Sequence, residues 1–325
     1  MGENTLLSVE DLVVKYFLRT STCEAVNGVS FTIDKGERVG LVGETGAGKT
    51  TTALSILDLV PNPPGRIVSG KIILNGEDVL TKSASEVRKI RGNDVAMIFQ
   101  DPMTSLNPVM TVGDQIMEVV RLHNDIGKFE AMDKAKEMLE LVGIPGERYL
   151  EYPHQFSGGM KQRVLIAMAL ACNPKLLIAD EPTSALDVTI QAQVLDLING
   201  LRERLGMSLL LITHDLGVVA ETCDRVMIMY AGSIVESGTI RAVYKNIKHP
   251  YTKGLFGSIP RLDIESDRLE PIKGMMPDPS NLPEGCAFCE RCPNAIERCK
   301  TERPKLEDIG DGHFVACFNP LKEGA

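Results

Sequence analysis

The stretch "GETGAGKT", residues 43–50, constrains the fold of this 325-residue chain more than any other. It matches the pattern G-x-x-x-x-G-K-[ST] and lies between a strand-like run, "RVGLVG", and a helix-like run, "KTTTALSILDLV". Glycines in this pattern let backbone N–H groups turn around phosphate oxygens, and the helix N-terminus adds positive potential. We therefore expect an α/β P-loop domain in which Lys49 reaches the β- and γ-phosphates of a nucleotide and Thr50 ligates Mg²⁺.

Strand-like and helix-like runs alternate over roughly the first 240 residues, as is typical of an α/β domain. Further strands are predicted at "DVAMIFQ", "KLLIAD" and "SLLLITHD", with a helix at residues 189–206 and a mainly helical stretch at 111–143. The run "KIILNGEDV" predicts an edge hairpin that turns at Asn75-Gly76. Residues 259–285 are rich in Pro, Gly and charge, which predicts a linker or an extended arm.

Composition excludes some classes of function. The net charge of −9 is unfavourable for sequence-independent nucleic-acid binding, which needs Lys and Arg against phosphates. No apolar run approaches the ~18 residues that span a bilayer, and the N-terminal residues lack the pattern of a secretory signal. We expect a cytoplasmic protein whose membrane role, if any, comes through a partner.

Acidic residues end the predicted strand "LLIADE", residues 176–181. Its apolar residues would carry Asp180 to the P-loop, where the carboxylate holds the Mg²⁺ shell. Glu181 would then orient an attacking water or accept its proton. The alternative is a strand that simply ends in acidic residues.

A second phosphate cradle is predicted at "FSGGMKQR", residues 156–163. Ser157, Gly158 and Gly159 open a helix that begins near Met160, so a hydroxyl and backbone N–H groups gather at its N-terminus. Two cradles far apart in sequence suit two chains arranged head to tail, each closing over the nucleotide of the other. An ordinary serine N-cap is the alternative.

In this order the motifs resemble those of ATP-binding cassette (ABC) ATPases over about residues 7–258. The resemblance implies a P-loop core with an antiparallel β subdomain and a helical subdomain. It adds Tyr16, with Phe17 as the alternative, as the aromatic that stacks on adenine, and Gln100 as the Q-loop glutamine. It also implies a D-loop at residues 184–187 and a switch histidine at His214. Gln100 could instead be a surface amide, His214 a core histidine and Asp187 a helix cap.

The implied nucleotide site takes in residues from all of these motifs. ATP would contact Tyr16, Gly43, Glu44, Thr45, Gly46, Ala47, Gly48, Lys49, Thr50, Thr51, Gln100, Ser157, Gly158, Gly159 and Asp180. Glu181 and His214 would be catalytic, and Thr50 and Gln100 would ligate Mg²⁺. In the family, the motif at residues 156–163 is called the signature. It departs here from the common family pattern at Phe156 and Met160, which flank the Ser-Gly-Gly core. Binding is expected to survive both changes.

The segment at residues 248–263 and the C-terminal tail resemble the oligopeptide/dipeptide transporter branch of the family. That resemblance implies the ATP-hydrolysing subunit of a peptide importer on the cytoplasmic face of the membrane. Its implied partners are a second homologous ATPase, giving a heterodimer, two membrane-spanning permeases and an extracytoplasmic peptide-binding protein. The implied domains are an ATPase domain, residues 1–258, and a C-terminal extension, residues 259–325.

The extension holds a cluster of cysteines. Five of the eight cysteines fall within residues 286–317, and clustered cytosolic thiols are more often metal ligands than disulfides. The resemblance selects four of them as ligands of a [4Fe–4S] cluster or of Zn²⁺, namely Cys286, Cys292, Cys299 and Cys317. The ferredoxin-like spacing favours iron–sulfur, and the site is expected to be structural. Cys289 departs from the family pattern, and free thiols in a disordered tail are the alternative.

Two competing classes of function differ from this interpretation. A soluble ABC ATPase of DNA repair or translation usually carries a coiled coil or a second cassette, whereas this chain has one P-loop and no heptads. A redox iron–sulfur protein with an incidental nucleotide site would not need the complete ATPase motif set. The remaining cysteines, Cys23, Cys172 and Cys223, are expected to be buried small hydrophobes.

Overall fold

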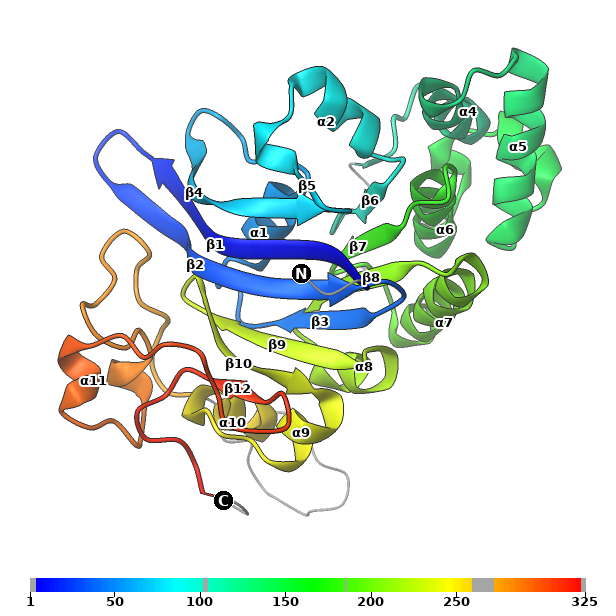
Figure 1. Cartoon of the computed structure of the whole chain (residues 1–325). Helices are drawn as coiled ribbons and strands as arrows, with labels where there is room; N and C mark the ends of the chain where they lie inside the picture. Colours follow the sequence, from blue (N-terminus) through cyan, green and yellow to red (C-terminus); the bar gives the residue numbers. More distant parts are fainter. Residues whose placement is uncertain (1–3, 102–104, 185, 259–271, 323–325) are drawn as a thin grey trace. The chain divides into compact units, whose positions relative to one another are not determined.

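The structure is a computed structural model that describes residues 4–101, 105–184, 186–258 and 272–322 (Figure 1). The described chain divides into two compact units. The first unit consists of residues 1–6, 33–38 and 78–212, and the second of residues 7–32, 39–77 and 213–325. Residues 259–271, the first half of the predicted linker, lie outside the described residues.

The second unit contains most of the strands and the C-terminal extension. Its strands are β1 (Thr5–Phe17), β2 (Thr22–Asp34), β3 (Arg38–Val42), β4 (Gly65–Leu74), β5 (Glu77–Asp78), β9 (Arg225–Tyr230), β10 (Ser233–Thr239), β11 (Glu307–Asp308) and β12 (Phe314–Val315). Its helices are α1 (Lys49–Ile56), α8 (Leu216–Thr222), α9 (Ile240–Lys245), α10 (Pro250–Gly257), the 3₁₀ turn η4 (Cys289–Arg291) and α11 (Arg298–Thr301).

The first unit is mainly helical around three strands. Its helices are η1 (Val79–Thr81), α2 (Ala84–Ile90), α4 (Val112–His123), α5 (Lys128–Leu141), η2 (Gly146–Leu150), η3 (Pro153–Gln155), α6 (Gly158–Leu170) and α7 (Val188–Leu205). Its strands are β6 (Val95–Ile98), β7 (Leu176–Asp180) and β8 (Ser208–Thr213).

An antiparallel sheet in the second unit has the strand order β2-β1-β4-β5. Leu7 of β1 faces Leu74 of β4 in the ladder, so both long strands bury one apolar face. The predicted hairpin turn is confirmed, because Asn75 and Gly76 take φ angles of 50° and 86° between β4 and β5. Positive φ at both positions matches the twist of the flanking strands, which explains why Asn-Gly forms this turn.

The other strands of the second unit follow the order β11-β12-β10-β9-β3. β3 and β9 run parallel, whereas β10 pairs antiparallel with both β9 and β12. The pair Glu236 and Val315 brings the C-terminal extension onto β10, where Figure 1 shows β12 beside it. The extension therefore adds strands to the sheet, an arrangement that sequence periodicity did not indicate.

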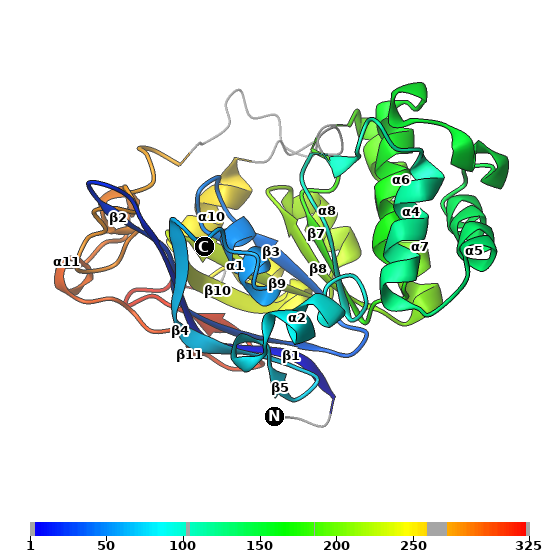
Figure 2. The same cartoon turned by 90° about the horizontal axis from the view of Figure 1, so that it is seen from above.

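In the first unit, β8, β7 and β6 are neighbouring parallel strands. All residues of β7 and β8 are buried, which is why these runs are continuously apolar rather than alternating. Figure 2 shows α4, α5 and α6 as a group of neighbouring helices at one end of this unit. The predicted helical stretch at 111–143 is confirmed as α4 and α5.

The predicted strands and the helix at 189–206 are confirmed with small shifts in their ends. The predicted helix after the P-loop is too long, because α1 ends at Ile56 and a Pro-rich turn comes next. Cys223 is buried as expected, but Cys23 and Cys172 are only half-buried. Among the described residues, no helix has both the length and the apolar character needed to cross a membrane.

Candidate active site

The P-loop, residues 43–50, connects β3 to α1 in the second unit. Gly48 has a φ angle of 104°, and a Cβ there would lie 2.4 Å from the carbonyl oxygen of Ala25. Gly43 is similarly confined, since its Cβ would lie 2.2 Å from the carbonyl oxygen of Met229. Only glycine satisfies both constraints, so the tight loop and its inward-turning backbone depend on packing against β2 and β9 as well as on the motif.

Lys49 is held by the loop that precedes it. Its side chain is buried, and Nζ donates to the carbonyl oxygens of Gly43 at 2.6 Å and Glu44 at 3.1 Å. This fixes the ammonium within the loop, where a phosphate would meet it. The next residue of α1, Thr50, is exposed, so its hydroxyl is open to a cation.

Tyr16 lies next to the end of the P-loop motif. Its hydroxyl is 3.4 Å from the hydroxyl of Thr51, the third residue of α1. Phe17 is 51% exposed, and its backbone N–H donates to Pro64. Tyr16 therefore contacts the helix that follows the P-loop, and its stacking on adenine, with Phe17 as the alternative, stays a prediction.

In the first unit, β7 carries Asp180 and Glu181 to its carboxyl end. Asp180 is 2% exposed, whereas Glu181 is half-buried and takes a φ angle of 46°. Left-handed backbone is strained for a glutamate and turns its side chain away from the strand direction. Its carboxylate accepts a hydrogen bond from Nε2 of Gln100 at 2.8 Å. The structure thus brings together the predicted Q-loop glutamine and the predicted general base.

The signature residues open α6. Ser157 is the N-cap, and its Oγ accepts from the backbone N–H of Met160 at 3.4 Å. Ser157 and Gly158 are exposed, so the N-terminus of this 13-residue helix is accessible. A Cβ on Gly159 would lie 2.7 Å from Ile190 of α7, so this glycine also has a packing role. The ordinary N-cap and the phosphate cradle are therefore compatible interpretations of the same residues.

Arg148 contacts both residues that depart from the common signature, and sequence reasoning missed it. Its guanidinium lies 4.4 Å from the ring centroid of Phe156 and donates to the sulfur of Met160 at 3.7 Å. A salt bridge to Glu151 at 2.6 Å, which raises the pKa of Arg148 and lowers that of Glu151, holds the side chain in place. Phe156 and Met160 thus form the face on which a neighbouring arginine packs.

The predicted D-loop and His214 follow β7 and β8 in the chain. His214 comes directly after β8 and is exposed. Asp187 caps α7, because its Oδ1 accepts from the backbone N–H of Ile190 at 3.1 Å. Ser184 bonds to the carbonyl oxygen of Glu181 at 3.2 Å. Residue 185, the second position of the predicted D-loop, lies outside the described residues.

The cysteines selected for a metal site lie near one another in the extension. Cys286 donates its backbone N–H to Cys299 at 2.8 Å. Burial raises the pKa of the Cys286 and Cys317 thiols to about 11, and the charges of the other cysteines of the set add to this. Over the described ranges, however, no group of three or more His, Cys, Asp or Glu side chains is arranged to hold a metal ion. The donor set suits a metal, but its present arrangement is not that of a formed site.

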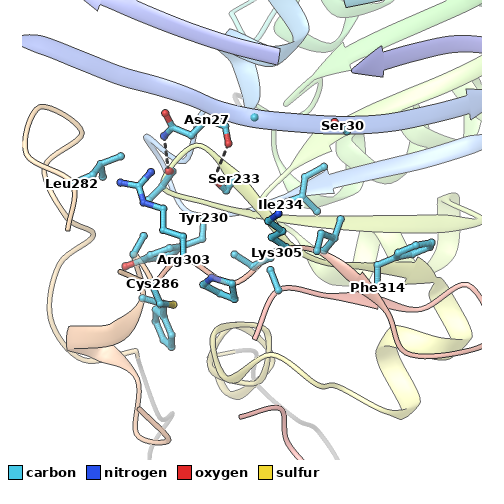
Figure 3. Close-up of a pocket in the computed structure, with 18 of the residues that line it drawn as sticks. Asn27, Ser30, Tyr230, Ser233, Ile234, Leu282, Cys286, Arg303, Lys305 and Phe314 are labelled. Carbon is cyan, nitrogen blue, oxygen red and sulfur yellow. Dashed lines mark hydrogen bonds between the residues drawn. The ribbon is translucent and has the colours of Figure 1, made fainter. Parts of the chain in front are cut away.

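The extension also borders a cavity of about 590 Å³ in the second unit. Figure 3 shows residues of β2 and of the turn between β9 and β10 on one side, with Ser233 bonded to the backbone of Asn27. Cys286, Arg303 and Lys305 of the extension line the other side. None of the described residues that line this cavity belongs to the P-loop. Its size is that of a ligand pocket, but its residues are not those of the nucleotide site.

Known families match two parts of this chain. The ABC transporter family matches residues 26–184, and the oligopeptide/dipeptide transporter C-terminal region matches residues 235–299. Among solved structures, the chain resembles the ATP-binding cassette MJ0796 in a dimeric post-hydrolysis state bound to ADP and Pi. That likeness has a TM-score of 0.65 at 26% identity and covers 72% of this chain and 99% of the other.

Curated relatives match nearly the whole length. The oligopeptide transport ATP-binding protein AppD of Bacillus subtilis (strain 168) is 52% identical over 99% of both chains. The dipeptide transport ATP-binding protein DppD of the same organism is 50% identical over 96% of this chain and 94% of its own. With its P-loop, signature and paired Gln100 and Glu181, the chain therefore belongs to the ABC transporter family, in the branch of the oligopeptide and dipeptide transport ATP-binding proteins.

Proposed function

We propose that this chain binds and hydrolyses ATP to energise an importer of dipeptides or oligopeptides. The observation that carries the proposal is the 52% identity to an oligopeptide transport ATP-binding protein over 99% of both chains. Neither competing class of function is favoured, because the relatives are peptide transport ATP-binding proteins and the similarity extends through the extension.

The P-loop would bind the phosphates of ATP. Lys49 would contact the β- and γ-phosphates, and Tyr16 would stack on the adenine above Thr51. Mg²⁺, when bound, would neutralise charge on the phosphate oxygens, and Thr50, Gln100 and Asp180 are the residues proposed to hold it and its shell. The exposed hydroxyl of Thr50 supports its part in this arrangement.

Glu181 would act on the attacking water. The hydrogen bond from Gln100 helps to fix the direction of the carboxylate, which is proposed to accept a proton from that water. The left-handed backbone at Glu181 supports a functional role, because such strain persists mainly at functional sites. His214 is proposed to hydrogen-bond the γ-phosphate as negative charge develops on it.

Ser157, Gly158 and Gly159 would close over the nucleotide of a second, homologous ATPase chain. Support comes from the exposed N-terminus of α6 and from the dimeric state of the similar cassette MJ0796. The full assembly is proposed to contain a heterodimer of ATPases on the cytoplasmic face of the membrane, with two permeases and an extracytoplasmic peptide-binding protein. Opening and closing of the ATPase dimer would switch the permeases between inward- and outward-facing states.

Replacing Glu181 tests the proposed chemistry. Glu181→Gln is expected to bind MgATP and to hydrolyse it at least ~100-fold more slowly in the assembled transporter, since a positioned base contributes about 10²–10⁴. Glu203→Gln, on an exposed position of α7, is the matched control and should keep native turnover. Unchanged turnover in Glu181→Gln would remove this residue from the role of base.

Four cysteines of the extension, Cys286, Cys292, Cys299 and Cys317, are proposed to hold a structural [4Fe–4S] cluster or Zn²⁺. Their proximity and the chemistry of the thiols support the proposal, and the absence of a formed site among the described residues requires the side chains to rearrange on binding. Anaerobically purified protein with about four irons per chain and absorbance near ~400 nm would identify iron–sulfur. Stoichiometric zinc without that band would identify zinc. Protein purified with no iron and no zinc would refute the site.

A further inference from the structure

We propose that Arg291 of the C-terminal extension is a positioning residue for the P-loop, because it neutralises and aims the carboxylate of Glu44. The inference rests on the proposed function, since it assigns a role in the ATP site to a residue outside the ATPase motifs. It also gives the extension a part in nucleotide binding that is separate from any metal.

Arg291 and Glu44, which are 247 residues apart in sequence, form a bidentate ion pair. Nη1 of Arg291 lies 2.9 Å from one oxygen of Glu44, and Nη2 lies 3.1 Å from the other. The arginine side chain is 7% exposed and the glutamate side chain 29%. A guanidinium that grips both oxygens of a carboxylate fixes its direction as well as its charge.

Arg291 is itself rigidly held. Its Nε donates to the carbonyl oxygen of Lys273 at 3.0 Å, and Nη1 also donates to the hydroxyl of Tyr230 at 3.2 Å. The guanidinium lies 5.9 Å from the ring centroid of Phe288, in the same turn of the extension. Because each guanidinium nitrogen has a fixed partner, the extension presents the positive charge at one place on the P-loop.

Another residue of the extension and a residue of α10 contact the loop at further points. A Cβ on Gly46 would lie 3.1 Å from the methyl carbon of Met276, so this methionine lies against the loop. The backbone N–H of Glu44 donates to the hydroxyl of Tyr251 at 3.0 Å. The rings of Tyr251 and Phe288 pack with centroids 5.4 Å apart. Glu44 is therefore held from both its side chain and its backbone by one connected cluster.

Charge explains why the pairing matters for ATP. Glu44 is a carboxylate inside a loop that must bind a polyanion, and an unpaired negative charge there would repel the phosphates. Arg291 removes that repulsion and keeps the carboxylate turned toward the extension. In this chain the extension supplies the cation that lies beside the P-loop glutamate.

The test is a double-mutant cycle in the full-length chain, with the dissociation constant of MgATP as the readout. Arg291→Gln is expected to weaken MgATP binding on the order of tenfold at low salt. In the Glu44→Gln background, the same Arg291→Gln change is expected to alter affinity less than about twofold, because no carboxylate is left to neutralise. Arg291→Lys should bind MgATP more tightly than Arg291→Gln and less tightly than the native chain, since lysine keeps the charge but not the bidentate geometry.

Several readouts separate this role from a general structural one. Arg298→Gln removes the exposed Arg298–Glu302 pair from the same extension and should leave affinity within about twofold. The defect of Arg291→Gln should shrink as salt is raised and should increase KM with little change in kcat. A loss that is the same in both Glu44 backgrounds, or native affinity in Arg291→Gln, would overturn the inference. If the unaltered chain fails to bind MgATP, the proposed function fails instead.

Discussion

Two helix N-termini in this protein are predicted to meet phosphate, and they are built in different ways. The P-loop before α1 is closed by glycines packed against backbone of β2 and β9, and by Arg291 from a distant part of the chain. The signature before α6 is capped by its own Ser157 and supported by Arg148, which lies 12 residues from Met160. The first depends on tertiary contacts, whereas the second depends mainly on neighbours in sequence.

This difference predicts which substitutions each site tolerates. A change at the P-loop meets fixed backbone atoms, which have little room to shift. At the signature, a Cβ on Gly158 would lie 3.8 Å from the side chain of Leu186, and beyond its own helix and chain neighbours no other described residue comes within 4 Å of it. We expect substitutions at the P-loop glycines to affect stability and nucleotide binding together. Substitution of Gly158 should affect mainly the closure of two ATPase chains over a shared nucleotide.

The largest expected effect comes from paired glycine substitutions. Gly48→Ala should reduce the free energy of unfolding by at least about 3 kcal/mol and abolish MgATP binding, because φ is 104° and the new Cβ overlaps the oxygen of Ala25. Gly158→Ala should leave stability within about 0.5 kcal/mol of the native chain. Urea unfolding and nucleotide titration of both variants measure these effects. Equal destabilisation by both would contradict the comparison.

Lowering the pH should destabilise the region around the P-loop, residues 43–50, before the region around the signature, residues 156–163. His249 lies in the aromatic cluster that includes Tyr251 and Phe288, and burial lowers its pKa from 6.5 to about 4, although the carboxylate of Glu236 opposes this. Below about pH 6.5 the unfolded chain therefore binds a proton that the folded chain does not. Stability should fall as the pH drops from 6.5 to about 4, by at most roughly 3 kcal/mol from this residue.

The matched control for this prediction is His249→Asn. Asparagine keeps an acceptor for the backbone N–H of Tyr251, which bonds to Nδ1 of His249 at 3.1 Å at the start of α10. The variant should lose stability less steeply between pH 6.5 and about 4 than the native chain does. Urea unfolding across that range gives the two slopes, and parallel slopes would exclude His249 as the cause. Hydrogen exchange should show residues 43–50 opening before residues 156–163.

The smallest expected effect is at Arg148. Arg148→Ala should lower the free energy of unfolding by about 1 kcal/mol, since it removes the contact with Phe156 at a partly exposed site. The affinity of the single chain for MgATP should not change, while ATPase activity of the assembled transporter should fall. Arg148→Lys keeps the charge but loses the planar stacking, so it should be intermediate. A weaker MgATP affinity in Arg148→Ala would show that the signature is not independent of the P-loop.

The α/β class, the motifs and most of the helices and strands could be predicted from the sequence alone. "RVGLVG", "KLLIAD" and the Asn75-Gly76 turn are local signals, because apolar periodicity and positive φ are properties of a few adjacent residues. The Ser157 cap is equally local. The same reasoning overextended α1, since the end of a helix depends on the turn after it as well as on its own residues. It also treated Cys23 and Cys172 as buried when they are only half-buried.

The surroundings of those motifs, in contrast, depend on contacts between segments that are distant in sequence. Pairing of β12 with β10, the reach of Arg291 to Glu44 and the support of Phe156 by Arg148 each join residues that no period or spacing relates. Such contacts arise because burial brings distant segments together, and the chemistry of a motif is then set by the charges and backbone atoms that it meets there. The P-loop could be identified from eight residues, but its glutamate acquires an ion-pair partner only in the fold.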